Sequence, residues 1–397
     1  MKEIPVYLFI DALGWEIVQK YNFLKDELPF RHSVKMQFGY SSTAIPTILS
    51  GEYPNRHNHF SFFYFDPVNS PFKIFRFLKY FFGAGLHPRC ILNRGRVRRY
   101  VSKLFSNVKG YTGYFQLYQV PYDKLCYFNY CEKEDIFAKN GIPPLKNLRD
   151  ILEDSGLRFL ISDWRKTESY NMYEAEETLL NEKIDFFFIY TAQFDSFLHD
   201  HVSDYQAVAE KLNFYESRLK SLFAHLKEKE ISVKFTVVSD HGMTPLKGTV
   251  DLMKFVEELG LEFAKDYAAV YDSTMARFWY LNSNAKLKIK NRLSDLDCRG
   301  SFLSEEEKIS YGIDFANSKF GEDIFLMEVG IQIAPCDLGR KPLNGMHGFS
   351  PEDKDSNACF LSTHPPSFIP LEVKDYFHLM KKDIDFLSLK LKSHKIK

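Results

Sequence analysis

The sequence lacks the features that mark several large classes of protein. Its six cysteines are scattered without a CxxC pair along 397 residues, which disfavours a disulfide scaffold or a cysteine-based zinc site and favours reduced thiols. No apolar run approaches the roughly 18 residues of a membrane-spanning helix. The first apolar stretch, Val6–Ile10, is too short for a signal peptide and is not followed by a cleavage site. These absences predict a cytoplasmic protein, either in solution or peripheral at the membrane.

Acidic residues are missing from one long segment. Lysine plus arginine and aspartate plus glutamate each total 52, so the net charge identifies no partner. Between Pro67 and Tyr122, however, there are ten lysines or arginines and no acid, interleaved with aromatic residues. Such a segment can attract a phosphate-bearing ligand, nucleotide- or lipid-linked, or an anionic membrane surface. A solvated basic face paired with acids elsewhere is the alternative, and no recognised module indicates specific nucleic-acid binding.

Short apolar runs alternate with helical patterns along the chain. Four runs have the composition of buried parallel strands: Val6–Ile10, Leu157–Ile161, Ile184–Tyr190 and Val233–Val238. A helix is predicted over Tyr205–Lys229, where apolar residues recur at three- to four-residue spacing. The alternation predicts an α/β fold with a mostly parallel central sheet and helices on both faces. We expect a single domain over residues 1–397, with cap insertions at 67–148 and 249–334.

Chemically capable side chains follow three of these strands. Asp11 ends the first, Asp195 and His199 follow the third, and the pair Asp240-His241 follows the fourth. Ligands of open α/β sheets collect at the carboxyl ends of the strands, so we expect these residues at one rim. Each signal is weak by itself, because an aspartate at a strand end is more often a cap and Asp195-x-x-x-His199 is compatible with a solvated helix start.

The candidates form a coherent set when His347, from the string Met-His-Gly, is added. Carboxylate and neutral imidazole groups are ligands that zinc and similar divalent ions prefer. Three aspartates and three histidines, with a hydroxyl group, suffice for two adjacent metals. Such a pair can hold both the attacking and the leaving oxygen of an in-line displacement at phosphorus. We expect two divalent ions, zinc or, as the alternative, manganese.

The motifs resemble one known family. Their order and spacing are similar to those of the type I phosphodiesterase/nucleotide pyrophosphatase branch of the alkaline phosphatase superfamily. The strings that carry the resemblance are Leu8-Phe9-Ile10-Asp11, Asp195-x-x-x-His199, Ser239-Asp240-His241-Gly242-Met243 and His347-Gly348-Phe349. The resemblance implies an alkaline phosphatase-like fold, with the closing strand and helix in Ser350–Met380. It also implies one metal on Asp195, His199 and His347 and another on Asp11, Asp240 and His241.

The same resemblance locates the nucleophile in the run Ser41-Ser42-Thr43. In the superfamily a hydroxyl or thiol stands ten residues before the glycine of a motif that ends Thr-Gly-x-x-Pro. Here Ser50-Gly51-Glu52-Tyr53-Pro54 fits that ending, and counting back from Gly51 gives Ser41, with Ser42 and Thr43 as competitors. The family's usual Thr-x-Pro string is absent. A helix that begins just after this run would direct free amides at a phosphate, and Pro46 would fit best in its first turn.

These residues predict a metal-dependent hydrolase of phosphate esters. A serine hydroxyl needs activation by a base or a metal, so we expect a phosphodiesterase or pyrophosphatase that forms a phosphoseryl intermediate at Ser41, which also binds one metal. Phosphomonoester hydrolysis or phosphotransfer at the same site is one alternative, and a non-catalytic protein of this fold that binds an anionic surface is another. Arg277 could reach the substrate phosphate; a structural pair with an acid is its alternative. No GxGxxG follows the first strand, which argues against a Rossmann enzyme.

Overall fold

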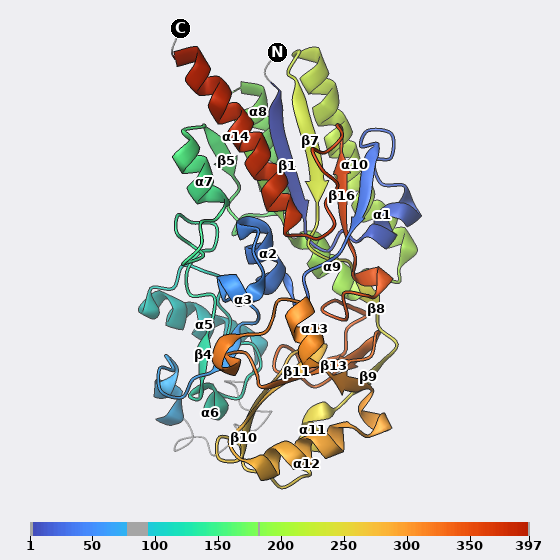
Figure 1. Cartoon of the computed structure of the whole chain (residues 1–397). Helices are drawn as coiled ribbons and strands as arrows, with labels where there is room; N and C mark the ends of the chain where they lie inside the picture. The colour runs from blue at the N-terminus through green and yellow to red at the C-terminus, as the bar shows by residue number, and fades with distance from the viewer. Residues whose placement is uncertain (1–2, 78–93, 182, 396–397) are drawn as a thin grey trace. The chain divides into compact units, whose positions relative to one another are not determined.

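The protein divides into two compact units. The computed structural model describes residues 3–77, 94–181 and 183–395, so Cys90 and part of the basic segment, 78–93, lie outside the described residues (Figure 1). The first unit consists of Met1–Tyr53, Phe137–Pro245 and Ser350–Lys397, and the second of Pro54–Ile136 and Leu246–Phe349. Each of the two segments of the second unit overlaps one predicted insertion and begins earlier in the chain than that insertion does.

The first unit is built on a six-stranded sheet with the order β2-β16-β7-β1-β6-β5. Its central strands β1 (Ile4–Ile10), β6 (Phe186–Thr191) and β7 (Val233–Val238) are parallel, as is β5 (Phe159–Ile161). All four predicted strands are therefore confirmed. The strand β16 (Ala358–Ser362) runs antiparallel to both β7 and β2 (Phe30–Val34). The expected α/β fold with a mostly parallel sheet is confirmed: among the six strands of this sheet only β16 is antiparallel, and it lies between the edge strand β2 and β7.

Helices cover both faces of this sheet. Successive side chains of a strand point to opposite faces, so each strand contributes side chains to the packing on both. Val6, Leu8 and Ile10 belong to a buried cluster with residues of α1 (Trp15–Tyr21), α8 (Glu168–Asn181) and α10 (Tyr205–Glu228). On the other face, the Tyr7 hydroxyl donates to Asp383 Oδ2 of α14 (Asp375–Lys395) at 2.7 Å. The predicted helix over Tyr205–Lys229 is confirmed as α10. Figure 1 shows α14 in front of β1 and α8 and α10 behind the sheet.

Two helices begin at the carboxyl ends of strands or close to them. The helix α9 (Gln193–His201) starts two residues after β6, and α2 (Ser41–Ser50) follows the extended residue Tyr40. The expectation for Pro46 is wrong: α2 begins at Ser41 itself, so the proline falls beyond the first turn. Its ring nitrogen cannot donate to the carbonyl of Ser42, four residues earlier. The first unit also contains α7 (Leu148–Ser155), η5 (Lys354–Ser356) and β8 (Thr244–Pro245).

The second unit has an antiparallel sheet and an aromatic core. The sheet has the order β10-β11-β13-β12, and two further strand pairs, β3 with β4 and β9 with β14, lie outside it. The strand bounds are β3 Phe63–Phe65, β4 Phe128–Tyr130, β9 Gly248–Val250, β10 Tyr267–Tyr271, β11 Met275–Tyr280, β12 Gly300–Phe302, β13 Asp323–Met327, β14 Ile331–Ile333 and β15 Gly345–Met346. The helices are α3 Pro54–His57, η1 Lys73–Phe77, α5 Gly95–Lys109, α6 Tyr122–Leu125, α11 Leu252–Glu257, α12 Ser283–Leu293, η3 Leu296–Cys298, α13 Glu305–Ser310 and η4 Ala316–Ser318.

Arg277 is a structural residue of this core. Its guanidinium group is fully buried and donates from Nε to Asp272 Oδ2 at 2.8 Å, and from Nη1 to the Phe63 carbonyl at 2.8 Å. The Ser61 hydroxyl accepts a third bond, at 2.8 Å. Arg277 therefore forms the structural ion pair with an acid, here Asp272, that was the alternative to a contact with the substrate phosphate. A guanidinium so enclosed stabilises the unit rather than binding a ligand.

No helix among residues 3–77, 94–181 and 183–395 is both long and apolar enough to cross a bilayer.

Candidate active site

Three of the predicted ligands meet at the carboxyl ends of neighbouring strands. Asp11 directly follows β1, and Asp240 and His241 come just after β7, which pairs with β1 in the register Phe9 to Val238. The ring nitrogen His241 Nε2 lies 3.6 Å from Asp11 Oδ1 and 3.2 Å from Asp240 Oδ2. One ligand atom from each residue lies within 4.8 Å of the other two, a spacing suited to a single metal ion.

Backbone groups orient two of these side chains. The carbonyl of Gly242 can only accept, so His241 Nδ1 keeps its proton and donates a hydrogen bond to this carbonyl at 2.9 Å. Nε2 then carries the lone pair, the form in which imidazole binds a metal. Asp240 Oδ1 accepts from the amides of Ala12 at 3.2 Å and His241 at 3.1 Å, while Oδ2 is directed toward the His241 ring nitrogen. Both residues are thus arranged with one ligand atom toward the cluster.

The electrostatics of the cluster favour a cation. Burial, then repulsion from Asp240 and Asp195, raises the pKa of Asp11 well above its ordinary value, and a hydrogen bond from Ser41 opposes that shift. Burial likewise raises the pKa of Asp240, although the neighbouring His241 acts in the opposite direction. Within the part of the chain that the structure describes, Asp11 Oδ1 and Asp240 Oδ2 are buried atoms with no hydrogen-bond partner. Because uncompensated buried carboxylates are costly, these residues fit a divalent metal ion.

Ser41 is the member of its run that faces the cluster. It is the first residue of α2, and its Oγ lies 3.1 Å from His241 Nε2. Ser42 Oγ is buried and has no partner among the described residues, and the side chain of Thr43 is fully buried. Of the three hydroxyl groups, the one at Ser41 lies at hydrogen-bond distance from a nitrogen of the candidate metal cluster.

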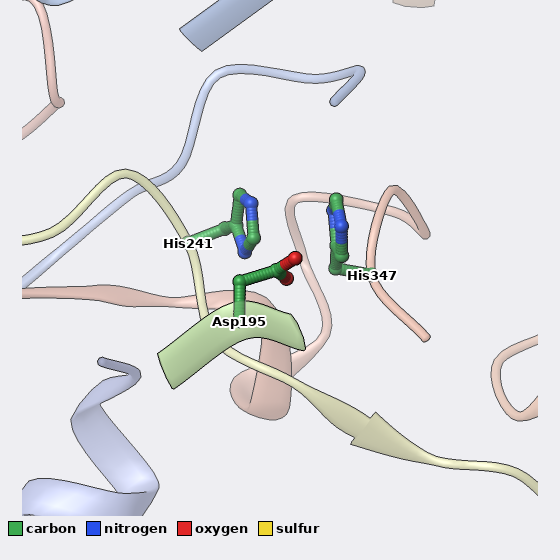
Figure 2. Close-up of side chains that lie close together, drawn as sticks. All are labelled: Asp195, His241 and His347. Carbon is green, nitrogen blue, oxygen red and sulfur yellow. The ribbon is translucent and has the colours of Figure 1, made fainter. Parts of the chain in front are cut away.

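Asp195 and His199 lie one turn apart on α9. Residues four apart share one face of a helix, and His199 Nε2 lies 3.4 Å from Asp195 Oδ2. Figure 2 shows the Asp195 carboxylate on its helix close to the His241 ring. The negative charge of Asp195 also contributes to the raised pKa values of Asp11 and Asp240. The two aspartate-histidine motifs are therefore neighbours within the first unit.

His347 belongs to the second unit and is the third side chain labelled in Figure 2. It directly follows β15 and is 5% exposed. Its backbone is fixed by Thr274, whose hydroxyl donates to the Gly348 carbonyl at 2.8 Å. Ser41 and the other five predicted ligands all come from the first unit.

Sequence reasoning did not identify the groups that orient the ligands. The amide of Ala12 and the carbonyl of Gly242 are backbone atoms, so no side-chain type signals their role. A partial signal was present in the string Asp240-His241-Gly242. A Cβ atom at Gly242 would lie 2.1 Å from the backbone oxygen of Asp355, which only a glycine avoids.

The fold resembles solved structures of ectonucleotide pyrophosphatase/phosphodiesterase 5. Human ectonucleotide pyrophosphatase/phosphodiesterase 5 matches with a TM-score of 0.64 at 14% identity, over 96% of this chain and 94% of that one. An inactive form of the murine protein in complex with AMP matches with a TM-score of 0.64 at 15% identity, over 97% and 95%. At these identities the likeness shows the fold. No curated protein sequence matches the chain.

The sequence itself establishes the family. The family model for type I phosphodiesterase/nucleotide pyrophosphatase matches residues 39–350, well over half of the chain. The matched region includes Ser41, Asp195, His199, Asp240, His241 and His347, whereas Asp11 precedes it. The chain therefore belongs to the type I phosphodiesterase/nucleotide pyrophosphatase family, whose members act on phosphoester bonds.

Proposed function

We propose that the protein hydrolyses a phosphodiester or pyrophosphate bond through Ser41 at a site for two divalent metals. The observation that carries the proposal is the position of Ser41 Oγ, 3.1 Å from His241 Nε2 in a cluster with the buried Asp11 and Asp240. When bound, such metals supply positive charge that favours the alkoxide of the serine, lowers the pKa of a water and stabilises the phosphoryl oxygens. Asp11, Asp240 and His241 would hold one of them.

Asp195, His199 and His347 would hold the other. The helical spacing of Asp195 and His199 supports their joint role. For His347 the support is the family resemblance of its motif together with its burial. The mixed nitrogen and oxygen ligand set favours zinc over metals that prefer oxygen alone.

The reaction proceeds in two displacements at phosphorus. Ser41 Oγ first attacks, forms the phosphoserine and releases the leaving oxygen. Water then attacks from the opposite side, breaks the bond between phosphorus and Oγ, and regenerates the hydroxyl group. Because Ser41 is the first residue of α2, the positive end of the helix dipole stabilises the phosphoryl charge throughout.

The substrate we propose is a nucleotide-like phosphate ester. Membership of the family supports the class of bond, and the murine relative in complex with AMP supports the nucleotide part. A chromogenic nucleotide diester such as thymidine 5′-monophosphate p-nitrophenyl ester is therefore a suitable probe, with p-nitrophenyl phosphate as the matching monoester. We expect faster cleavage of the diester. A preference for the monoester would contradict this part of the proposal.

The nucleophile is tested with two neighbouring alanine substitutions. Ser41→Ala should lower kcat by at least about 10³-fold, while metal analysis of the purified variant still detects the bound ions. Ser42→Ala removes a hydroxyl from the next residue and should retain activity within about tenfold. Full activity of Ser41→Ala would refute the assignment. A wild-type protein that binds no metal and cleaves neither substrate would refute the enzyme itself.

A further inference from the structure

The helix α5 presents an outer face that is both cationic and apolar. Its inner face is anchored in the second unit by the buried Ser102 and Phe105. On the outer face the exposed side chains Tyr100, Leu104 and Val108 recur every fourth residue, with 69%, 53% and 75% of their surface accessible. Residues four apart lie one above the other on a helix. They therefore form an apolar stripe along α5, a helix about 22 Å long.

Three exposed cations, Arg96, Arg99 and Lys103, line one side of the stripe. Like charges three and four residues apart repel each other on a helix. The first turn of α5 contains no acid, although the positive end of a helix dipole favours one there. Both features oppose the stability of the isolated helix, and an anionic partner would relieve both.

A second basic helix in the same unit, α12, has cations that form ion pairs within the chain. On α12, Lys290 lies 3.2 Å from Asp323 Oδ2 and Arg292 lies 2.9 Å from Asp297 Oδ1. By contrast, within the described residues no carboxylate lies at ion-pair distance from the three outer cations of α5. These two cations of α12 are thus paired with acids of the chain, whereas the three outer cations of α5 are exposed.

We propose that the outer face of α5 docks on an anionic phospholipid surface. The stripe of Tyr100, Leu104 and Val108 would enter the boundary between headgroups and acyl chains while Arg96, Arg99 and Lys103 contact lipid phosphates. This is the pattern of a helix that lies in the interface plane. The combination of an apolar stripe with unneutralised cations selects a lipid surface over nucleic acid, because a phosphate backbone alone would leave the stripe in water. The inference does not depend on the proposed hydrolysis.

Vesicle co-sedimentation of the full-length chain tests the electrostatic part. The wild type should bind vesicles of phosphatidylcholine with added phosphatidylserine, bind phosphatidylcholine alone far more weakly, and dissociate at about 0.5 M salt. Arg99→Gln with Lys103→Gln should weaken binding about 25-fold, since each cation near an anionic surface contributes about fivefold. The matched control, Lys227→Gln with Lys288→Gln, removes the same charge from exposed positions on α10 and α12 and should bind as the wild type does.

The apolar part has its own pair of variants. Tyr100→Ser with Leu104→Ser keeps every charge but should weaken binding to the phosphatidylserine vesicles at low salt, whereas Leu287→Ser, at a residue of α12 that is 61% exposed, should not. Circular dichroism melts confirm that each variant is folded. Equal binding by the α5 variants and their controls would overturn the proposal. The proposal would also be overturned if the wild type failed to bind the vesicles but bound a DNA duplex through Arg99 and Lys103.

Discussion

Gly242→Ala should weaken metal binding by moving a backbone group that the metal never contacts. A Cβ atom at this position would lie 2.1 Å from the backbone oxygen of Asp355, whereas ordinary contact begins at 3.4 Å. The difference, 3.4 − 2.1 = 1.3 Å, must be met by backbone displacement, since neither atom belongs to a flexible side chain. The amide of Gly242 also donates to the Ser356 carbonyl at 3.0 Å. The backbone around Gly242 therefore cannot move far without losing this hydrogen bond.

The displacement acts on His241 through one hydrogen bond. The Gly242 carbonyl holds His241 Nδ1 at 2.9 Å, and a movement of 1.3 Å along that direction would leave no hydrogen bond. Loss of the partner that orients a histidine ligand typically costs 10- to 100-fold in metal affinity, or about 1.4–2.7 kcal/mol. The added methyl group should also lower the free energy of unfolding by about 1–3 kcal/mol.

Competition with a chromophoric zinc chelator measures the affinity, and thermal unfolding with and without EDTA measures the stability contributed by the metal. Gly248→Ala is the control, because its Cβ atom would meet only Ile331 Cδ1 at 3.5 Å, an ordinary contact. It should leave the zinc affinity unchanged. If Gly242→Ala is destabilised but binds zinc as tightly as the wild type, the glycine serves packing alone and the orienting role of its carbonyl is refuted.

Two further predictions concern buried charges in the second unit. Arg277→Met leaves Asp272 buried without its cationic partner, so the free energy of unfolding measured in guanidinium chloride should fall by about 3–5 kcal/mol. The control Arg299→Met breaks an exposed ion pair with Glu328 and should lower it by no more than about 1 kcal/mol. Burial raises the pKa of Asp337 from 3.8 to about 6, so the folded protein keeps a proton that the unfolded chain releases. The contribution of Asp337 to stability should therefore fall by about 2 kcal/mol as the pH rises from 4 to 6. Asp337→Asn should flatten that part of the profile, and an unchanged slope would exclude Asp337 as its source.

The strands and the longest helix could be predicted because their signals are local. Each apolar run of the central sheet is short and bounded by polar residues, and the periodicity of α10 extends over all of its 24 residues. The antiparallel strand β16 has no local signal of direction, so only the family resemblance indicated a closing strand there. The helix start at Ser41 was missed by a few residues. A Ser-Ser-Thr run suggests an N-cap, but the residue with extended backbone before the helix is Tyr40.

The candidate site was likewise predictable only where the signal in the sequence is local. The identities of Asp11, Asp240 and His241 follow from their place after two strands, but their orientation depends on contacts between distant parts of the chain. The amide that holds Asp240 belongs to Ala12, 228 residues away. Ala12 has φ 61°, a left-handed conformation that alanine adopts at a cost of about 1 kcal/mol or more. No sequence pattern indicates that conformation, because nothing about an alanine favours it; only the surrounding strands can impose it. The strain is located where it directs the Ala12 amide at Asp240, a carboxylate of the candidate metal cluster, so part of the folding free energy of the sheet is used to preorganise this cluster.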